Sequence, residues 1–239
     1  ATVLGAATVF FFRRDLSATI QRIFLGFAAG VMIAASVWSL LIPAMEMAEE
    51  QGGNVLLSVG GGFLLGGAFL LALDGLMPHL HPGSDQPEGL PAKLRRTTMV
   101  VLAVTLHNIP EGMAVGLAFA LAATGEGFAA ASALALGIGI QNFPEGAAVA
   151  LPLRQEGYTR LQAFAGGTLS GAVEPLFGIL AVLASAWATP LMPWLLSFAA
   201  GAMLYAVAAE LVPQAHSRAG TWGFVVGFAV MMTLDVALG

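Results

Sequence analysis

The sequence carries one hexapeptide twice, as His107-Asn108-Ile109-Pro110-Glu111-Gly112 and as Gln141-Asn142-Phe143-Pro144-Glu145-Gly146. Each copy lies inside an apolar run long enough for the roughly 20 residues that cross a bilayer. The first residue and the glutamate of each copy are four apart, so they share one face of a helix. Each proline removes a hydrogen bond to the carbonyl four residues earlier, at Leu106 or Ile140, which predicts a bend.

These polar side chains fall in the middle of the predicted membrane helices, where ionisable groups are costly and usually functional. Imidazole, amide and carboxylate groups form the ligand set of a divalent transition metal. We therefore expect His107, Glu111 and Glu145 to be ligands, with Gln141 in the place of the imidazole. Asn108 and Asn142 either serve a second ion or cap the carbonyls that the prolines release, and the pattern leaves both roles open.

The composition predicts a polytopic membrane protein. Of 239 residues, 58% are hydrophobic and 10% are charged, whereas a soluble domain carries about 25% charged residues. No basic patch suited to nucleic acid is present. The chain has no cysteine, which excludes disulfides and thiolate ligands, so nitrogen, oxygen or a methionine sulfur must hold any metal.

We expect an all-α fold with eight transmembrane helices in a single domain, residues 1–239. The expected spans are 1–12, 23–45, 55–77, 97–122, 127–151, 159–186, 190–212 and 220–239, and 78–96 is a short cytoplasmic loop. Residues 1–12 cover only about 18 Å as a helix, too little for a bilayer. We interpret them as the second half of a first span, with a signal-peptide remnant as the alternative.

The basic residues fix the expected orientation. Arginine and lysine occur only in alternate connections, at Arg13, Arg14, Arg22, Lys93, Arg95, Arg96, Arg154, Arg160 and Arg218. The opposite connections carry Glu49, Glu50 and Glu126 but no base. The positive-inside rule places the basic side in the cytoplasm and both termini outside.

Internal similarity predicts inverted repeats. Phe27-Ala28-Ala29-Gly30-Val31-Met32 of the second span matches Phe198-Ala199-Ala200-Gly201-Ala202-Met203 of the seventh. The third span matches the eighth, with Gly62-Phe63, Gly66 and Asp74 against Gly223-Phe224, Gly227 and Asp235. The spans then form a 3+2+3 arrangement, a pattern typical of secondary transporters. Chance similarity between apolar segments is the alternative.

Further candidates lie outside the hexapeptides. Glu174, which precedes Pro175, is either a ligand of a second ion or a packing carboxylate, and Met32 is filler unless its place in the repeat matters. Glu46 lies in an acidic cluster that either attracts cations at an entrance or is an ordinary solvated surface. Asp74, His79 and His81 suggest an exit-side or regulatory contact. Glu210 and Asp235 are relays or simple helix-end residues.

At these residues the chain resembles the bacterial type of the ZIP (Zrt-/Irt-like) family of divalent metal transporters. The resemblance rests on the two hexapeptides, Glu174-Pro175, the eight-span layout and the external termini, and it covers nearly the whole chain. It implies a binuclear site between spans four, five and six. One ion would bind His107, Glu111, Gln141, Glu145 and Met32, and its neighbour Asn108, Glu111, Asn142, Glu145 and Glu174, with bridging carboxylates.

The resemblance also implies a cytoplasmic exit at Asp74, His79 and His81, and an elevator-type movement of spans one, four, five and six against the others. Two departures matter. Asn142 replaces a carboxylate found in some bacterial members, which weakens the second ion site. The loop after span three is short and has few histidines, which argues against strong regulation through it.

We therefore expect a transporter, and no catalytic residue, in the inner membrane of a bacterium. It would carry Zn²⁺ into the cytoplasm, with Cd²⁺, Fe²⁺ and Mn²⁺ as alternatives that tolerate the same ligands. An intramembrane metal-dependent hydrolase is the alternative function, although the His-Glu-x-x-His pattern of such enzymes is absent. A proton-coupled carrier of an organic substrate is a third hypothesis. The expected partners are divalent ions and lipid, and the chain is either a monomer or a homodimer.

Overall fold

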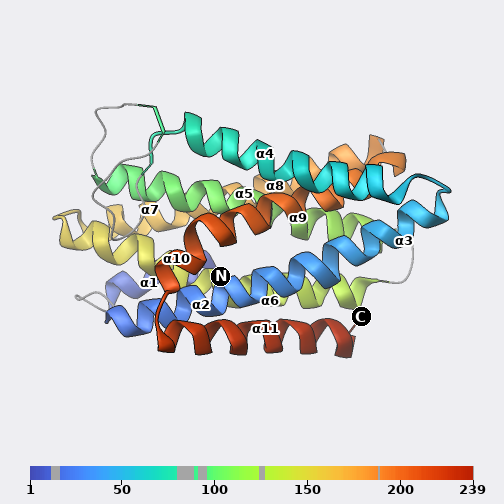
Figure 1. Cartoon of the computed structure of the whole chain (residues 1–239). Helices are drawn as coiled ribbons and strands as arrows, with labels where there is room; N and C mark the ends of the chain where they lie inside the picture. The colour runs from blue at the N-terminus through green and yellow to red at the C-terminus, as the bar shows by residue number, and fades with distance from the viewer. Residues whose placement is uncertain (12–16, 80–88, 91–95, 124–126, 188, 239) are drawn as a thin grey trace.

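The computed structural model describes residues 1–11, 17–79, 89–90, 96–123, 127–187 and 189–238, which form a bundle of helices aligned along one axis (Figure 1). The helices of the first half are α1 (Thr2–Ala7), η1 (Thr8–Phe10), α2 (Ala18–Ala35), η2 (Ser36–Leu41), α3 (Ile42–Glu50), η3 (Leu56–Gly60), α4 (Gly61–Leu76) and α5 (Arg96–Ala122). Those of the second half are α6 (Phe128–Gln155), α7 (Arg160–Gly171), α8 (Val173–Trp187), η4 (Thr189–Leu191), α9 (Met192–Ala206), η5 (Val207–Leu211), α10 (Val212–Ala215) and α11 (Arg218–Leu238). His81 and Glu126 lie outside the described residues.

The prediction of an all-α polytopic membrane protein is confirmed. Within the described residues, 6 helical segments are long and apolar enough to cross a membrane. Helix α1 is too short to be one of them. Helix α6 is not among them although it has 28 residues, because Gln141, Asn142 and Glu145 interrupt its apolar run. The total of eight spans therefore stays a prediction.

Backbone contacts at glycines repeat between the two halves of the chain. A Cβ atom on Gly30 or Gly227 would meet the carbonyl oxygens of Phe224 and Phe27, where α2 crosses α11. At the equivalent positions, a Cβ on Gly201 or Gly66 would meet the carbonyl oxygens of Phe63 and Phe198, where α9 crosses α4. Only glycine permits such close helix packing. The matched contacts support the internal repeat that the sequence predicts.

The hexapeptide glycines make the same kind of contact in the rest of the bundle. Gly112 of α5 lies against the backbone of Glu174, next to the start of α8, and Gly146 of α6 lies against the backbone of Thr2 in α1. Helix α8 is thereby held against α5, and α1 against α6. The glycine that ends each hexapeptide thus brings another helix to within backbone contact of the polar residues.

Two widened turns also match between the halves. Ser36–Leu41 (η2) and Val207–Leu211 (η5) are π-helical, and each ends just before a proline, at Ile42-Pro43 and Val212-Pro213. A proline lacks the N–H that an α-helix needs and its ring collides with the preceding turn, so a wider turn relieves the conflict. Such turns occur frequently at functional sites.

Helix α2 and helix α11 begin, and α6 ends, at the same end of the bundle (Figure 1). These helix ends carry Arg22, Arg218 and Arg154 respectively. We call this the basic end of the bundle. The segregation agrees with the predicted topology, and which side of the membrane the basic end faces stays a prediction.

Candidate functional site

The two hexapeptides face each other across the contact between α5 and α6. The side-chain amide of Gln141 donates a hydrogen bond of 2.7 Å to Oε1 of Glu111. Both side chains are fully buried, with no exposed surface. Burying a carboxylate is unfavourable unless it is hydrogen-bonded and its charge is balanced. Gln141 supplies one hydrogen bond to Glu111 but does not balance its charge.

Glu174 joins the second hexapeptide to α1. Its Oε2 accepts a 2.7 Å hydrogen bond from the amide of Asn142, and its Oε1 accepts a 2.8 Å bond from the hydroxyl of Thr2. The structure therefore brings Glu174 and Asn142 together, as the predicted second ion site requires. Thr2 has no distinguishing sequence signal, since it is a lone hydroxyl in an apolar segment.

Asn108 supports the break between α7 and α8. Helix α7 ends at Gly171, and Pro175 has no N–H with which to reach back to that turn. The amide of Asn108 donates a 2.8 Å hydrogen bond to the carbonyl of Ser170. Asn108 therefore caps a carbonyl of α7, and not one of its own helix α5 as the sequence suggests. Its side-chain oxygen Oδ1 is buried.

His107 pairs with a residue that the sequence does not connect to it. Its Nε2 lies against Oε1 of Glu210, in η5. Glu145 lies within electrostatic reach of both His107 and Glu210, and Glu111 within reach of Glu145 and Glu174. The ionisable residues of α5, α6, α8 and η5 therefore form one electrostatic neighbourhood.

Five buried oxygen atoms of the hexapeptides have no hydrogen-bond partner among the described residues. They are Oδ1 of Asn108, Oε2 of Glu111, Oε1 of Gln141, Oδ1 of Asn142 and Oε2 of Glu145. Every one is an acceptor, and an unsatisfied buried acceptor costs about 1–3 kcal/mol or more. A cation would satisfy several of them at once, so the donor set fits a metal ion.

The carboxylates and imidazoles do not by themselves form a compact cage. Among the described residues, no three His, Asp or Glu side chains come close enough together to hold one ion. His107 is turned toward Glu210, and Gln141 lies against Glu111. An ion bound here must therefore use amide oxygens as well as carboxylates, in keeping with the mixed ligand set of the sequence pattern.

Cavities reach the hexapeptides from opposite ends of the bundle. One, of about 100 Å³, is lined by Gln141 and Glu145 together with residues from the basic end, including Gln21 and Gln214. Another, of about 550 Å³, is lined by Glu111, Asn142 and Glu174 and extends along α8 away from the basic end. The hexapeptides thus separate two cavities.

Met32 is fully buried in α2, in the apolar cluster that also contains Ile138 of α6.

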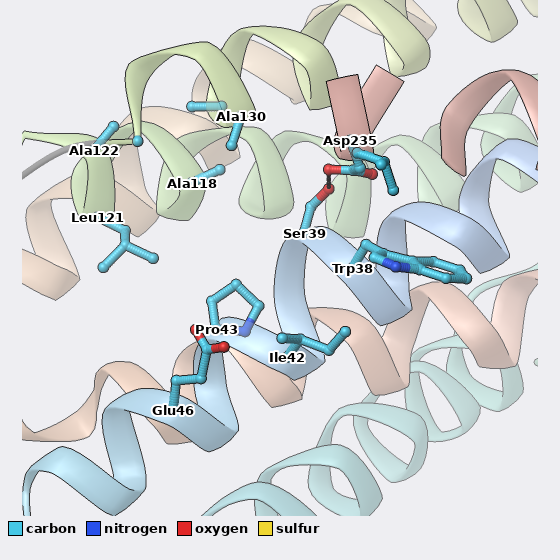
Figure 2. A pocket seen from close by; sticks show the side chains of 13 residues that line it. Trp38, Ser39, Ile42, Pro43, Glu46, Ala118, Leu121, Ala122, Ala130 and Asp235 are labelled. Carbon is cyan, nitrogen blue, oxygen red and sulfur yellow. Dashed lines mark hydrogen bonds between the residues drawn. The ribbon is translucent and has the colours of Figure 1, made fainter. Parts of the chain in front are cut away.

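A third cavity, of about 440 Å³, lies at the end of the bundle opposite the arginines. Figure 2 shows Ser39 and Asp235 meeting beside it, and the Ser39 hydroxyl donates a 2.8 Å hydrogen bond to Oδ1 of Asp235. Oδ2 of Asp235 is buried without a partner in the described residues. Glu46, which is exposed, lines the same cavity one turn after Pro43. Ser39 was not predicted to contribute.

Two of the predicted exit residues, Asp74 in the last turn of α4 and His79 just after that helix, form a separate cluster. Nε2 of His79 lies 2.9 Å from Oδ1 of Asp74, and Nδ1 of His79 lies 2.8 Å from the carbonyl oxygen of Met77. Tyr205 of α9 donates a 3.3 Å hydrogen bond to Oδ2 of Asp74. His79 is completely buried, so it is a structural part of this end of the bundle and not a free loop residue.

A bundle of membrane helices with unsatisfied buried oxygen atoms between two cavities is the arrangement of a polytopic membrane protein that handles cations. Residues 84–235 match the family model described as ZIP Zinc transporter. The chain is 38% identical to zinc transporter ZIP11 of Homo sapiens, covering 100% of this chain and 94% of that protein. It is 40% identical to zinc transporter GufA of Myxococcus xanthus, covering 100% of this chain and 95% of that protein. It is also 40% identical to zinc transporter ZIPB of Bordetella bronchiseptica, covering 100% of this chain and 78% of that protein.

The chain belongs to the ZIP zinc transporter family. This confirms the resemblance noted from the hexapeptides, and it confirms that the protein is a transporter and not an enzyme. The hydrolase alternative is therefore set aside.

Proposed function

We propose that this protein carries Zn²⁺ across the membrane into the cytoplasm and binds it at the facing hexapeptides of α5 and α6. The observation that carries the proposal is the set of five buried, unpartnered oxygens on these two motifs. Relatives that align with the whole chain are named zinc transporters, which supports zinc as the cargo. Cd²⁺, Fe²⁺ and Mn²⁺ tolerate similar ligands and should compete to differing extents.

The first ion would bind His107, Glu111, Gln141 and Glu145, with Met32 approaching from α2. The contact between Gln141 and Glu111 supports this set, because it places ligands of both helices within one ion's reach. The second ion would bind Asn108, Asn142 and Glu174, with Glu111 and Glu145 bridging the two ions. The hydrogen bond between Asn142 and Glu174 supports that set.

Changing Glu174 to Gln should lower the amount of bound zinc from two ions per chain to one. The glutamine keeps the size of the side chain and can still bond Thr2, but it removes the charge that only the second ion uses. Metal analysis of purified protein after equilibrium dialysis measures the ratio. A variant that still binds two ions would contradict the two-site arrangement, and one that binds none would show that Glu174 belongs to a single shared site.

The proposed route begins at the cavity beside Glu46 and Asp235 (Figure 2). Carboxylates at a cavity mouth concentrate cations by electrostatic focusing. The ion then exchanges its water for the hexapeptide ligands, and leaves through the cavity at Gln141 and Glu145 toward the basic end. The cluster of Asp74 and His79 would lie on the way out.

The segregation of the arginines supports the proposed orientation of the chain, with the basic end in the cytoplasm. In a chain without native cysteine, the variant Gln51→Cys should react with a membrane-impermeant maleimide in intact cells. The matched variant Glu156→Cys should react only after the membrane is opened, because it lies at the basic end after α6. Both positions are exposed. The reverse labelling pattern would overturn the proposed orientation.

The glycine contacts support a movement of one block of helices against another. Among the described glycines, backbone contacts join α2 to α11 and α4 to α9, and separately join α1 to α6 and α5 to α8. Gly137, where α6 meets α2 and α11, instead faces the side chains of Met231 and Val31. Side-chain contacts can slide past one another more easily than interlocked backbones. We propose that α1 and α5–α8 move as a unit relative to α2–α4 and α9–α11.

Reconstituted liposomes test the proposed function directly. Purified protein in vesicles containing a zinc-sensitive dye should admit Zn²⁺ faster than vesicles without protein, and added Cd²⁺ should slow the signal. Equal rates with and without the protein would contradict zinc transport by this chain.

A further inference from the structure

The ion pair between His107 and Glu210 joins one of the proposed zinc ligands to a residue in a widened turn. Glu210 lies in η5, a π-helical turn, and the exposed fractions of the two side chains are only 11% and 5%. A buried carboxylate next to an imidazole is the arrangement that orients metal-binding histidines in many proteins.

The internal repeat provides a comparison within the same chain. The second span aligns with the seventh at a constant spacing, so that Phe27 matches Phe198, Met32 matches Met203 and Ser39 matches Glu210. The turns η2 and η5 begin at the equivalent residues Ser36 and Val207. Ser39 therefore occupies in the first half the place that Glu210 occupies in the second.

The two hexapeptides differ at their first residue. The first has His107 where the second has Gln141. In the second half of the chain, Glu210 contacts the imidazole of His107. In the first half, Ser39 instead donates a hydrogen bond to Asp235. Gln141, the counterpart of His107, donates one to Glu111. A glutamine side chain has no tautomer to select, whereas a neutral imidazole has two, and a neighbouring carboxylate can select between them. The turn that contacts the histidine, η5, thus carries a carboxylate, Glu210. The equivalent turn in the first half, η2, carries the hydroxyl of Ser39 at the same position.

We propose that Glu210 is a positioning residue for zinc binding: its carboxylate lies against Nε2 of His107 and fixes the orientation of the imidazole that would bind the ion. This inference rests on the proposed role of His107 as a zinc ligand. The two ring nitrogens of an imidazole are distinct, and a partner on one of them fixes the tautomer and the orientation of the ring.

A role of this kind differs from direct binding of the ion by Glu210. If Glu210 acts through the imidazole, removing its charge should weaken zinc binding only while His107 is present. If Glu210 is itself a ligand, the loss should remain when His107 is replaced. A double-mutant cycle separates the two because coupled residues give non-additive effects.

The experiment measures zinc affinity of the purified chain by competition with a chelator, for the wild type, Glu210→Gln, His107→Gln and the double variant. We expect Glu210→Gln to weaken binding by about 10-fold or more, and to have no further effect in the His107→Gln background. The exposed variant Glu156→Gln serves as a matched loss of one carboxylate. Thermal denaturation of each variant in detergent checks that it is folded.

Each outcome has a separate meaning. If His107→Gln leaves the affinity unchanged, the proposed zinc site itself is wrong. If His107→Gln weakens binding but Glu210→Gln does not, or if Glu210→Gln weakens it equally in both backgrounds, the positioning role is wrong while the site stands.

Discussion

Replacing Glu111 by alanine should abolish zinc uptake. Glu111 is fully buried, its Oε2 has no partner in the described residues, and the proposed arrangement has it bridging both ions. Loss of an outer-shell partner typically costs a metal site about 10–100-fold, so loss of a bridging carboxylate should cost at least about 100-fold. Uptake of radioactive zinc by cells expressing each variant measures the effect.

Glu111→Gln refines the same prediction. It keeps the size of the side chain and an oxygen that can accept from Gln141, but it removes the negative charge. We expect it to be nearly as inactive as the alanine variant, because the charge offsets that of the ion. Glu156→Gln, at the exposed end of α6, should transport normally. Uptake near the wild-type rate in either Glu111 variant, at equal protein level in the membrane, would remove the hexapeptides from the transport mechanism.

The second large effect concerns the fold. Gly30→Val and Gly201→Val should each destabilise the protein strongly and to a similar extent. A Cβ atom at either position would overlap a backbone carbonyl, that of Phe224 or that of Phe63. Backbone atoms cannot move aside as a flexible side chain can, so the helices must separate. Overpacking of this kind costs about 1–3 kcal/mol or more, and thermal denaturation in detergent measures it.

Gly75→Val is the matched control for these variants. Gly75 also lies in a membrane helix, α4, but nothing lies within 4 Å of the place where its Cβ would be. It should therefore melt near the wild-type temperature. Equal melting temperatures for Gly30→Val and the control would contradict the close packing of α2 against α11. A large effect at Gly30 with none at Gly201 would contradict the equivalence of the two halves.

Much of this architecture is predictable because membrane helices follow simple rules. The apolar runs, the segregated arginines and the repeated glycines identify helices and their equivalences without any tertiary information. The widened turn η5 has a visible cause in Pro213, although the apolar run 190–212 predicts a continuous helix there. Span six is likewise divided into α7 and α8 at Ala172, just before Glu174-Pro175.

The candidate site is predictable in its ligands but not in its contacts. The four-residue spacing of His107 and Glu111 places them on one helix face. No local pattern, however, indicates that His107 pairs with Glu210, because the two residues are far apart in sequence and the contact depends on how α5 packs against η5. The contacts of Thr2 with Glu174 and of Ser39 with Asp235 could not be predicted either. A hydroxyl in an apolar helix usually donates its hydrogen bond to the backbone of its own helix.

The central claim is that zinc binds between the two hexapeptides, and anomalous X-ray scattering from crystals soaked in zinc tests it most directly. Data collected on either side of the zinc absorption edge should give a peak between Glu111, Gln141 and Glu145, with a second peak beside Asn142 and Glu174. Strong zinc peaks elsewhere in the bundle, with none between α5 and α6, would contradict the account.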